Sequence, residues 1–71
     1  MNKSFGNKLR LLRTQQGLYQ KDLAAELGVS REIISYWESG KKKPNIDTIL
    51  KLCDILDTNP NELLDYTPKK K

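Results

Sequence analysis

Apolar side chains recur at helical spacing at the start of the chain. Phe5, Leu9 and Leu12 stand at positions i, i+4 and i+7, which places them on one face of a helix. Ser4 is of the residue type that caps helix N-termini, and Gly17 is of the type that follows helix C-termini. We therefore expect a first helix that is capped by Ser4, ends near Gly17 and has one buried stripe.

Two short helices are predicted to follow, with only three residues between them. The first of these begins near residues 19–20 and ends at Gly28, a residue that is free to adopt positive φ. Its buried side chains are expected to be Leu23, Ala24 and Leu27. Ser30 is predicted to cap the next helix, which runs to about Ser39 and ends at Gly40.

Asparagine caps introduce two further helices in the second half of the chain. Asn45 is predicted to cap a helix that ends near Asp57, and Asn59 a last, short one with Pro60 at its first position and Glu62 three residues after the cap. The residues expected to face inward are Ile46, Ile49, Leu50, Cys53, Leu56, Leu63 and Leu64. No strand pattern, repeat or long linker is evident, so the sequence predicts an all-α chain of five helices.

Composition limits the function of such a chain. Its 71 residues suffice for one domain, and 37% hydrophobic with 31% charged residues fits a compact soluble one. We expect a cytoplasmic protein, because there is no apolar run of the ~20 residues that a membrane span needs and no signal peptide. With Cys53 as the only cysteine and no histidine, we expect no disulfide, metal site, cofactor or enzymatic activity.

The charge is distributed unevenly along the chain. Residues 1–43 carry nine Lys/Arg and four Asp/Glu, a net charge of +5, whereas residues 44–68 have a net charge of −4. A basic front half suggests a face that binds a polyanion. We expect the domain to comprise residues 1–66, followed by a basic, disordered tail at 67–71.

The junction between the second and third helices has a specific pattern. Residues 28–30, Gly-Val-Ser, supply positive φ, an apolar plug and a cap, and a turn of this length sets two helices at roughly 90–120°. Such a close crossing needs a small residue on the second helix, where Ala24 stands, and large apolar residues on the third, where Ile34 and Trp37 stand. Together these positions predict a helix-turn-helix.

On these residues the chain resembles the phage-repressor and Cro-type (xenobiotic-response-element-like) helix-turn-helix family of DNA-binding domains. The resemblance covers about residues 5–65 and includes the segments LRLLRTQQGLYQKDLAAELGVS, REIISYWESGKKKPN, DTILKLCDIL and NELL. It implies a compact, lambda-repressor-like fold of five helices. It also implies that the third helix enters the major groove of double-stranded DNA while the second lies across the backbone.

The resemblance assigns roles to individual side chains. Gln20 is expected to contact a phosphate and to support the third helix, and Lys41 and Lys43 to contact phosphates from the loop after that helix. Arg13 and Glu38 are expected to form a partly buried ion pair between the first and third helices. The positions expected to face DNA are Ser30, Arg31, Glu32 and Tyr36.

Helical geometry also divides the third helix into two faces. If Ile34 and Trp37 form the buried face, Ser35 groups with the DNA-facing residues on the opposite side. Ile33 falls at the boundary, at a family position near the DNA backbone. The guanidinium of Arg31 can donate two hydrogen bonds to the edge of a guanine. The carboxylate of Glu32 can accept a hydrogen bond from cytosine, hold the side chain of Arg31 in place, or act only as a charge that repels other bases. In many relatives Thr or Ser caps the second helix, and Tyr19 stands there in this chain.

These features predict a sequence-specific transcriptional regulator of bacterial or phage origin, most simply a repressor. It would bind a pseudo-palindromic operator as a homodimer, with half-sites one DNA turn apart, and would use no small-molecule ligand. The dimer surface is predicted at the carboxyl end, from Ile55, Leu64 and Tyr66. The alternative is an adaptor or antitoxin that binds a protein partner and for which DNA binding is secondary.

Overall fold

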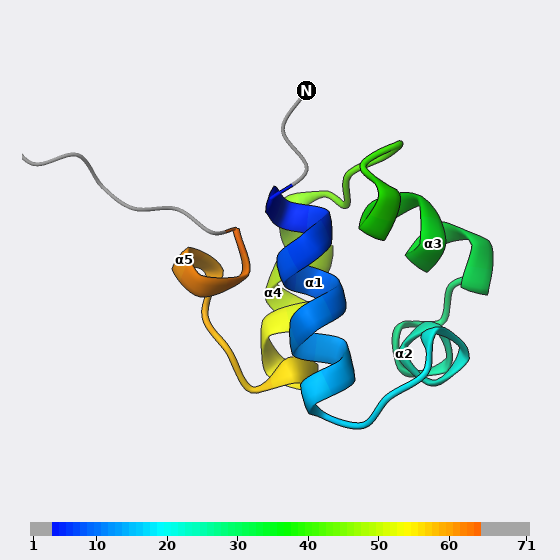
Figure 1. Cartoon of the computed structure of the whole chain (residues 1–71), viewed down its shortest axis with the longest axis horizontal. Coiled ribbons are helices and arrows are strands. Elements are labelled where there is room, and N and C mark those ends of the chain that lie inside the picture. Colours follow the sequence, from blue (N-terminus) through cyan, green and yellow to red (C-terminus); the bar gives the residue numbers. More distant parts are fainter. Residues whose placement is uncertain (1–3, 65–71) are drawn as a thin grey trace, which may run out of the picture.

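The structure, a computed structural model, describes residues 4–64 and contains five helices in that range (Figure 1). The helices are α1 (Ser4–Gln15), α2 (Gln20–Leu27), α3 (Arg31–Ser39), α4 (Ile46–Leu56) and α5 (Pro60–Leu63). No strand occurs among residues 4–64. The predicted all-α fold is therefore confirmed.

The helices pack around one core. α1 packs against α3 and α5, α2 packs against α3 and α4, and α4 packs against α5. In Figure 1, α2 and α3 lie on one side of α1, and α5 lies on the other. The buried apolar residues come from all five helices: Phe5, Leu9, Leu23, Ala24, Ile34, Trp37, Ile49, Leu52, Cys53, Leu56 and Leu63. The result is that α3 rests mainly on α1 and α2 and keeps one long face free.

Three of the predicted caps are formed by the expected side chains. The hydroxyl of Ser30 accepts from the N–H of Ile33 at 3.3 Å. The side-chain amide oxygens (Oδ1) of Asn45 and Asn59 accept from the backbone N–H groups three residues later, at 2.9 and 2.8 Å. Each cap satisfies a helix N–H that has no partner within its own helix. The cap of Ser30 fixes the start of α3.

Two helix starts differ from the prediction. In the described residues α1 begins at Ser4 itself, so Ser4 is a helical residue rather than a cap. At α2, the phenol of Tyr19 makes no capping bond, because its hydroxyl lies at the far end of a rigid ring. The carboxylate of Asp22 instead accepts from the N–H of Tyr19 at 2.8 Å. Of the two reciprocal hydrogen bonds of a capping box, the one from the N–H of the cap residue to the side chain three residues later is therefore present, and the one to the side chain of the cap residue is missing.

The buried face of α4 was predicted incorrectly at two positions. Ile46 and Leu50 are 68% and 50% exposed, whereas Leu52, which was not predicted to be buried, is fully enclosed. The buried stripe runs through Ile49, Leu52, Cys53 and Leu56, and one such stripe covers only part of the helix circumference. An apolar face wider than the core can accept therefore remains on the outside of α4.

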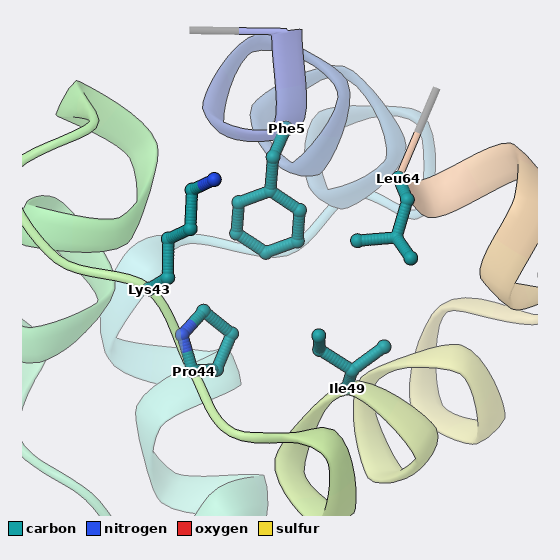
Figure 2. Close-up of a pocket in the computed structure, with 5 residues that line it drawn as sticks. All are labelled: Phe5, Lys43, Pro44, Ile49 and Leu64. Carbon is teal, nitrogen blue, oxygen red and sulfur yellow. The ribbon is translucent and has the colours of Figure 1, made fainter. Parts of the chain in front are cut away.

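Two smaller expectations were also wrong. Leu64 follows the last residue of α5 and is 39% exposed, although its side chain lines a small cavity with Phe5 and Ile49 (Figure 2). Val29, expected to plug the turn before α3, is 36% exposed.

Gly28 and Gly40 end α2 and α3 in the left-handed conformation, with φ of 73° and 86°, as expected from the sequence.

Gly6 permits the closest approach between α1 and α3. A Cβ at this position would lie 2.8 Å from the carbonyl oxygen of Trp37 and closer still to that of Glu38. Both carbonyls belong to the last turn of α3, so the contact joins backbone to backbone. The absence of a side chain at Gly6 therefore sets how closely the two helices pack.

Replacing Gly6 with alanine should lower the free energy of unfolding by about 1–3 kcal/mol, because the added methyl forces α1 away from α3. At an unconstrained helix position the same change raises the free energy of unfolding by about 1 kcal/mol. The sign of the change therefore shows whether Gly6 is in close contact with α3. Urea unfolding measures the difference. Asn7→Ala, at an exposed neighbouring position of α1, is the control and should be neutral or mildly stabilising. A stabilised Gly6→Ala variant would contradict the close contact.

Burial raises the pKa of the Cys53 thiol above its ordinary value of 9.0, and the negative charge of Asp54 raises it further. Above that ordinary value the thiol ionises in the unfolded chain but not in the folded one, so stability should fall as the pH rises. The free energy of unfolding should therefore decrease more between pH 7 and pH 10 in the original chain than in Cys53→Ala. Equal pH dependence in the two proteins would exclude this contribution.

Candidate nucleic-acid interface

α3 presents one anchored face and one free face. Ile34 is fully buried and Trp37 is nearly so, and both belong to the core. On the opposite side Arg31 and Glu32 are exposed, while Ser35 and Tyr36 are half-buried. Ser30 is exposed at the cap position. The division into two faces follows the helical period, as expected from the positions of the two large apolar residues.

Ile33 lies between these faces. It is half-buried and packs against the core, and its N–H is the group that bonds to the Ser30 hydroxyl. Its side chain thus supports the first turn of α3 while its outer edge remains accessible. The structure places it at the boundary, where sequence reasoning also placed it.

A buried ion pair holds α3 on α1. The expected pair of Arg13 and Glu38 is present: Nε of Arg13 donates to Oε2 of Glu38 at 2.6 Å, and Nη2 donates to Oε1 at 3.2 Å. Arg13 also donates from Nη1 to the carbonyl oxygen of Leu18 at 2.7 Å. Only 9% of the arginine side chain and 6% of the glutamate side chain are exposed. A bidentate pair with so little exposure fixes orientation as well as distance.

Gln20 joins the same network from the start of α2. Its Nε2 donates to Oε1 of Glu38 at 3.1 Å, which provides the support for α3 that the resemblance implies. Gln20 also lines a cleft in front of the N-terminus of α2, together with Arg13, Tyr19, Lys21 and Arg31. Cationic side chains and a helix N-terminus make this cleft suited to an anion.

A second cleft, between α1 and α3, was not anticipated from the sequence. Its lining residues are Arg10, Arg13, Gln20, Ser35, Glu38 and Ser39. Arg10 is exposed, and it adds a cation beside the free face of α3 from α1, a helix for which no DNA contact was predicted. The available signal was its position three residues before Arg13, which places both on the same side of α1.

The basic loop, residues 41–43, continues the cationic surface beyond the C-terminus of α3. The ring centroid of Tyr36 lies 5.7 Å from Nζ of Lys41 and 5.5 Å from Nζ of Lys42, within the range of cation–π attraction. The N–H of Lys41 donates to the carbonyl oxygen of Tyr36 at 2.9 Å. Tyr36 thus holds the start of the loop next to α3. Lys43 is exposed.

Of the three predicted dimer residues, the structure describes Ile55 and Leu64. Ile55 is half-buried and packs against the core, whereas Leu64 is exposed. Tyr66 lies outside the described residues, as does the tail at 67–71.

Between residues 4 and 64 no helix has the length and apolarity to cross a membrane, and no group of three or more potential metal ligands occurs there.

Breaking the Arg13–Glu38 pair should be costly. Glu38→Leu leaves the arginine buried without its counter-charge, and we expect the free energy of unfolding to fall by about 3–5 kcal/mol. The double variant Arg13→Met with Glu38→Leu removes both charges and should be more stable than the single one. The control is Lys8→Ala, which breaks the exposed 3.2 Å pair with Glu62 and should cost at most about 1 kcal/mol. Urea unfolding would contradict the network if Glu38→Leu cost no more than Lys8→Ala.

Comparison with known proteins identifies the family. The HTH_3 (helix-turn-helix) family model matches residues 9–63. The transcriptional activator BcrR of Enterococcus faecalis is 43% identical over 60 residues, which are 84% of this chain but only 29% of that protein. The chain therefore spans less than a third of that relative's length.

Two solved structures are similar over nearly their whole length. The restriction–modification controller protein C.AhdI of Aeromonas hydrophila is 41% identical with a TM-score of 0.79, over 86% of this chain and 92% of that one. The c2 repressor of phage P22, in complex with a synthetic operator, is 31% identical with a TM-score of 0.80, over 87% and 94%. With these matches and the α2–α3 geometry, the chain belongs to the helix-turn-helix family whose members include phage repressors and controller proteins.

Proposed function

We propose that this protein is a transcriptional regulator that binds double-stranded DNA sequence-specifically through the free face of α3. The observation that carries the proposal is the position of that face between two cationic regions. Lys21 lines the cleft at the N-terminus of α2, and Arg10 lines the cleft between α1 and α3. The basic loop, residues 41–43, follows the C-terminus of α3. A helix in the major groove has phosphates on both sides, so cations in both places are what it requires.

The similarity to the P22 c2 repressor, solved with an operator, supports the same mode of binding. In this mode Arg31, in the first turn of α3, reads a guanine through O6 and N7. Glu32 and Ser35 line the same face, and Ser30 and Ile33 approach the backbone at its start. Gln20, Lys41 and Lys43 contact phosphates, which supply affinity rather than sequence information.

The regulator acts in the cytoplasm as a homodimer on two half-sites about 34 Å apart, one DNA turn, and represses by covering a promoter. Relatives named as regulators and control proteins support a role in transcription. The chain does no catalysis in this proposal. Ile55, Leu64 and Tyr66 remain the dimer residues expected from the sequence, and of these Leu64 is exposed in the described range.

Selection of binding sites from a random pool of duplex DNA tests this function. We expect a pseudo-palindromic consensus, and Arg31→Ala should make one base pair per half-site permissive, with a loss of discrimination of about 1–3 kcal/mol at that pair. Affinity should fall steeply with salt.

Two variants serve as controls in the same measurement. Lys41→Ala should weaken binding to all sequences alike and reduce the salt slope by about one. Lys51→Ala, an exposed lysine of α4 outside the proposed interface, should change neither quantity. An unchanged consensus for Arg31→Ala would remove Arg31 from base reading, and salt-independent or absent binding would refute the function.

A further inference from the structure

The cleft between α1 and α3 is lined by charged and polar side chains alone. Its volume is about 300 Å³. The lining side chains come from α1, from the start of α2 and from α3. Such a cleft offers hydrogen bonds and little apolar contact, so it is suited to a small polar ligand.

The net charge of this cleft comes from Arg10, because the charges of Arg13 and Glu38 cancel. Both oxygens of Glu38 accept from Arg13, at 2.6 and 3.2 Å, and Oε1 also accepts from Gln20 at 3.1 Å. A carboxylate that is so fully bonded and only 6% exposed repels an incoming anion little. The guanidinium of Arg10 is exposed and forms no ion pair within residues 4–64. The cleft therefore attracts anions.

Two neutral donors are available beside Arg10. The amide nitrogen of Gln20 carries two hydrogens and uses one of them on Glu38, which leaves the other free to donate. The side-chain hydroxyl of Ser35 makes no hydrogen bond to another described residue. One cleft thus holds a cationic donor from α1, an amide from α2 and a hydroxyl from α3.

A phosphate group is the anion that this set of donors fits. A guanidinium can donate two parallel hydrogen bonds to a phosphate, and amide and hydroxyl groups are the other common donors to phosphate oxygens. Because the donors come from three helices around one cleft, they suit a tetrahedral group better than a planar carboxylate.

We propose that the cleft between α1 and α3 binds a phosphate group, with Arg10 as the charged ligand and with Gln20 and Ser35 as neutral donors. Such a group occurs in the DNA backbone and in small phosphorylated molecules. As a site for the DNA backbone, the cleft rests on the proposed function and adds α1 to the helices that contact DNA. As a site for a small molecule, it makes DNA binding sensitive to that molecule, because Ser35 belongs to the free face of α3.

The first experiment is a nuclear magnetic resonance titration of the full 71-residue chain with inorganic phosphate, at constant ionic strength and without DNA. We expect saturable shifts of the Gln20 side-chain amide and of the backbone amides around Arg10 and Ser35. Arg10→Ala should raise the dissociation constant on the order of tenfold, because charge-assisted hydrogen bonds are lost. Arg10→Lys keeps the charge without the two parallel N–H groups and should give an intermediate value. Urea unfolding checks that the variants fold.

Two serines of α3 that line the same cleft provide a matched pair of variants. The hydroxyl of Ser39 already donates to the carbonyl oxygen of Tyr36 at 3.2 Å, so its proton is not available to an anion. Ser35→Ala should therefore weaken the binding of inorganic phosphate, and Ser39→Ala should leave it unchanged. Equal effects of the two changes would remove Ser35 from the site.

Binding to the selected duplex DNA distinguishes the two sources of phosphate. The cleft lies beside the free face of α3, so we expect Arg10→Ala to weaken binding to all sequences alike and to reduce the salt slope by about one. Lys8→Ala is the matched control, because Lys8 lies on the same helix but pairs with Glu62 of α5 at 3.2 Å. It should leave the salt slope unchanged. Loss of phosphate binding with unchanged DNA affinity in Arg10→Ala would identify a small phosphorylated molecule as the ligand.

The inference is overturned if Arg10→Ala changes neither the binding of inorganic phosphate nor the affinity for DNA, and the proposed function then still stands. A chain that selects no duplex refutes the proposed function alone, because the phosphate titration contains no DNA and still decides whether the cleft is a site.

Discussion

Arg13 and Glu38 are charged side chains in a place that water barely reaches, and the position of α3 depends on their pairing. Taking two charges out of water is costly, and only complete hydrogen bonding compensates for it. Here that condition is met by Leu18 and Gln20, which satisfy further atoms of the pair. Any shift of α3 along α1 would leave one of these atoms without a partner. The network therefore favours one position of α3 over neighbouring ones more strongly than apolar packing does, since apolar contacts tolerate sliding.

Gly6 contributes a second constraint at the other end of the same contact. It brings the backbone of α1 against the last turn of α3, while Arg13 lies two turns further along α1. One point of contact is steric and the other is electrostatic, and together they determine how α3 lies on α1. Ile34 and Trp37 fill the space between the helices. Ser30 and Tyr36 of the free face act within α3 and its flanking loop: the Ser30 hydroxyl caps the first turn, and the Tyr36 carbonyl oxygen accepts from the N–H of Lys41.

The sequence predicted what depends on local chemistry. Asn45, Asn59 and Ser30 cap helices because a side-chain oxygen next to a helix start has few other roles, and the spacing of Ala24, Gly28 and Trp37 indicated a helix-turn-helix. It could not show which apolar residues of α4 are buried, because Leu50 and Leu52 differ only in which neighbours they meet. Nor did it reveal Gly6, whose role depends on the backbone of a helix some thirty residues away.

The free face of α3 contributes little to the stability of the fold, and this has an evolutionary consequence. The side chains of Arg31, Glu32 and Ser35 make no hydrogen bond or ion pair within the described residues, so their replacement breaks none. Duplicated genes for such a domain can acquire new operator preferences by single substitutions, without first passing through unstable intermediates. Because Arg13 and Glu38 hold α3 from its buried side, the free face tolerates change, and cellular networks with many regulators of one architecture can arise from such a domain.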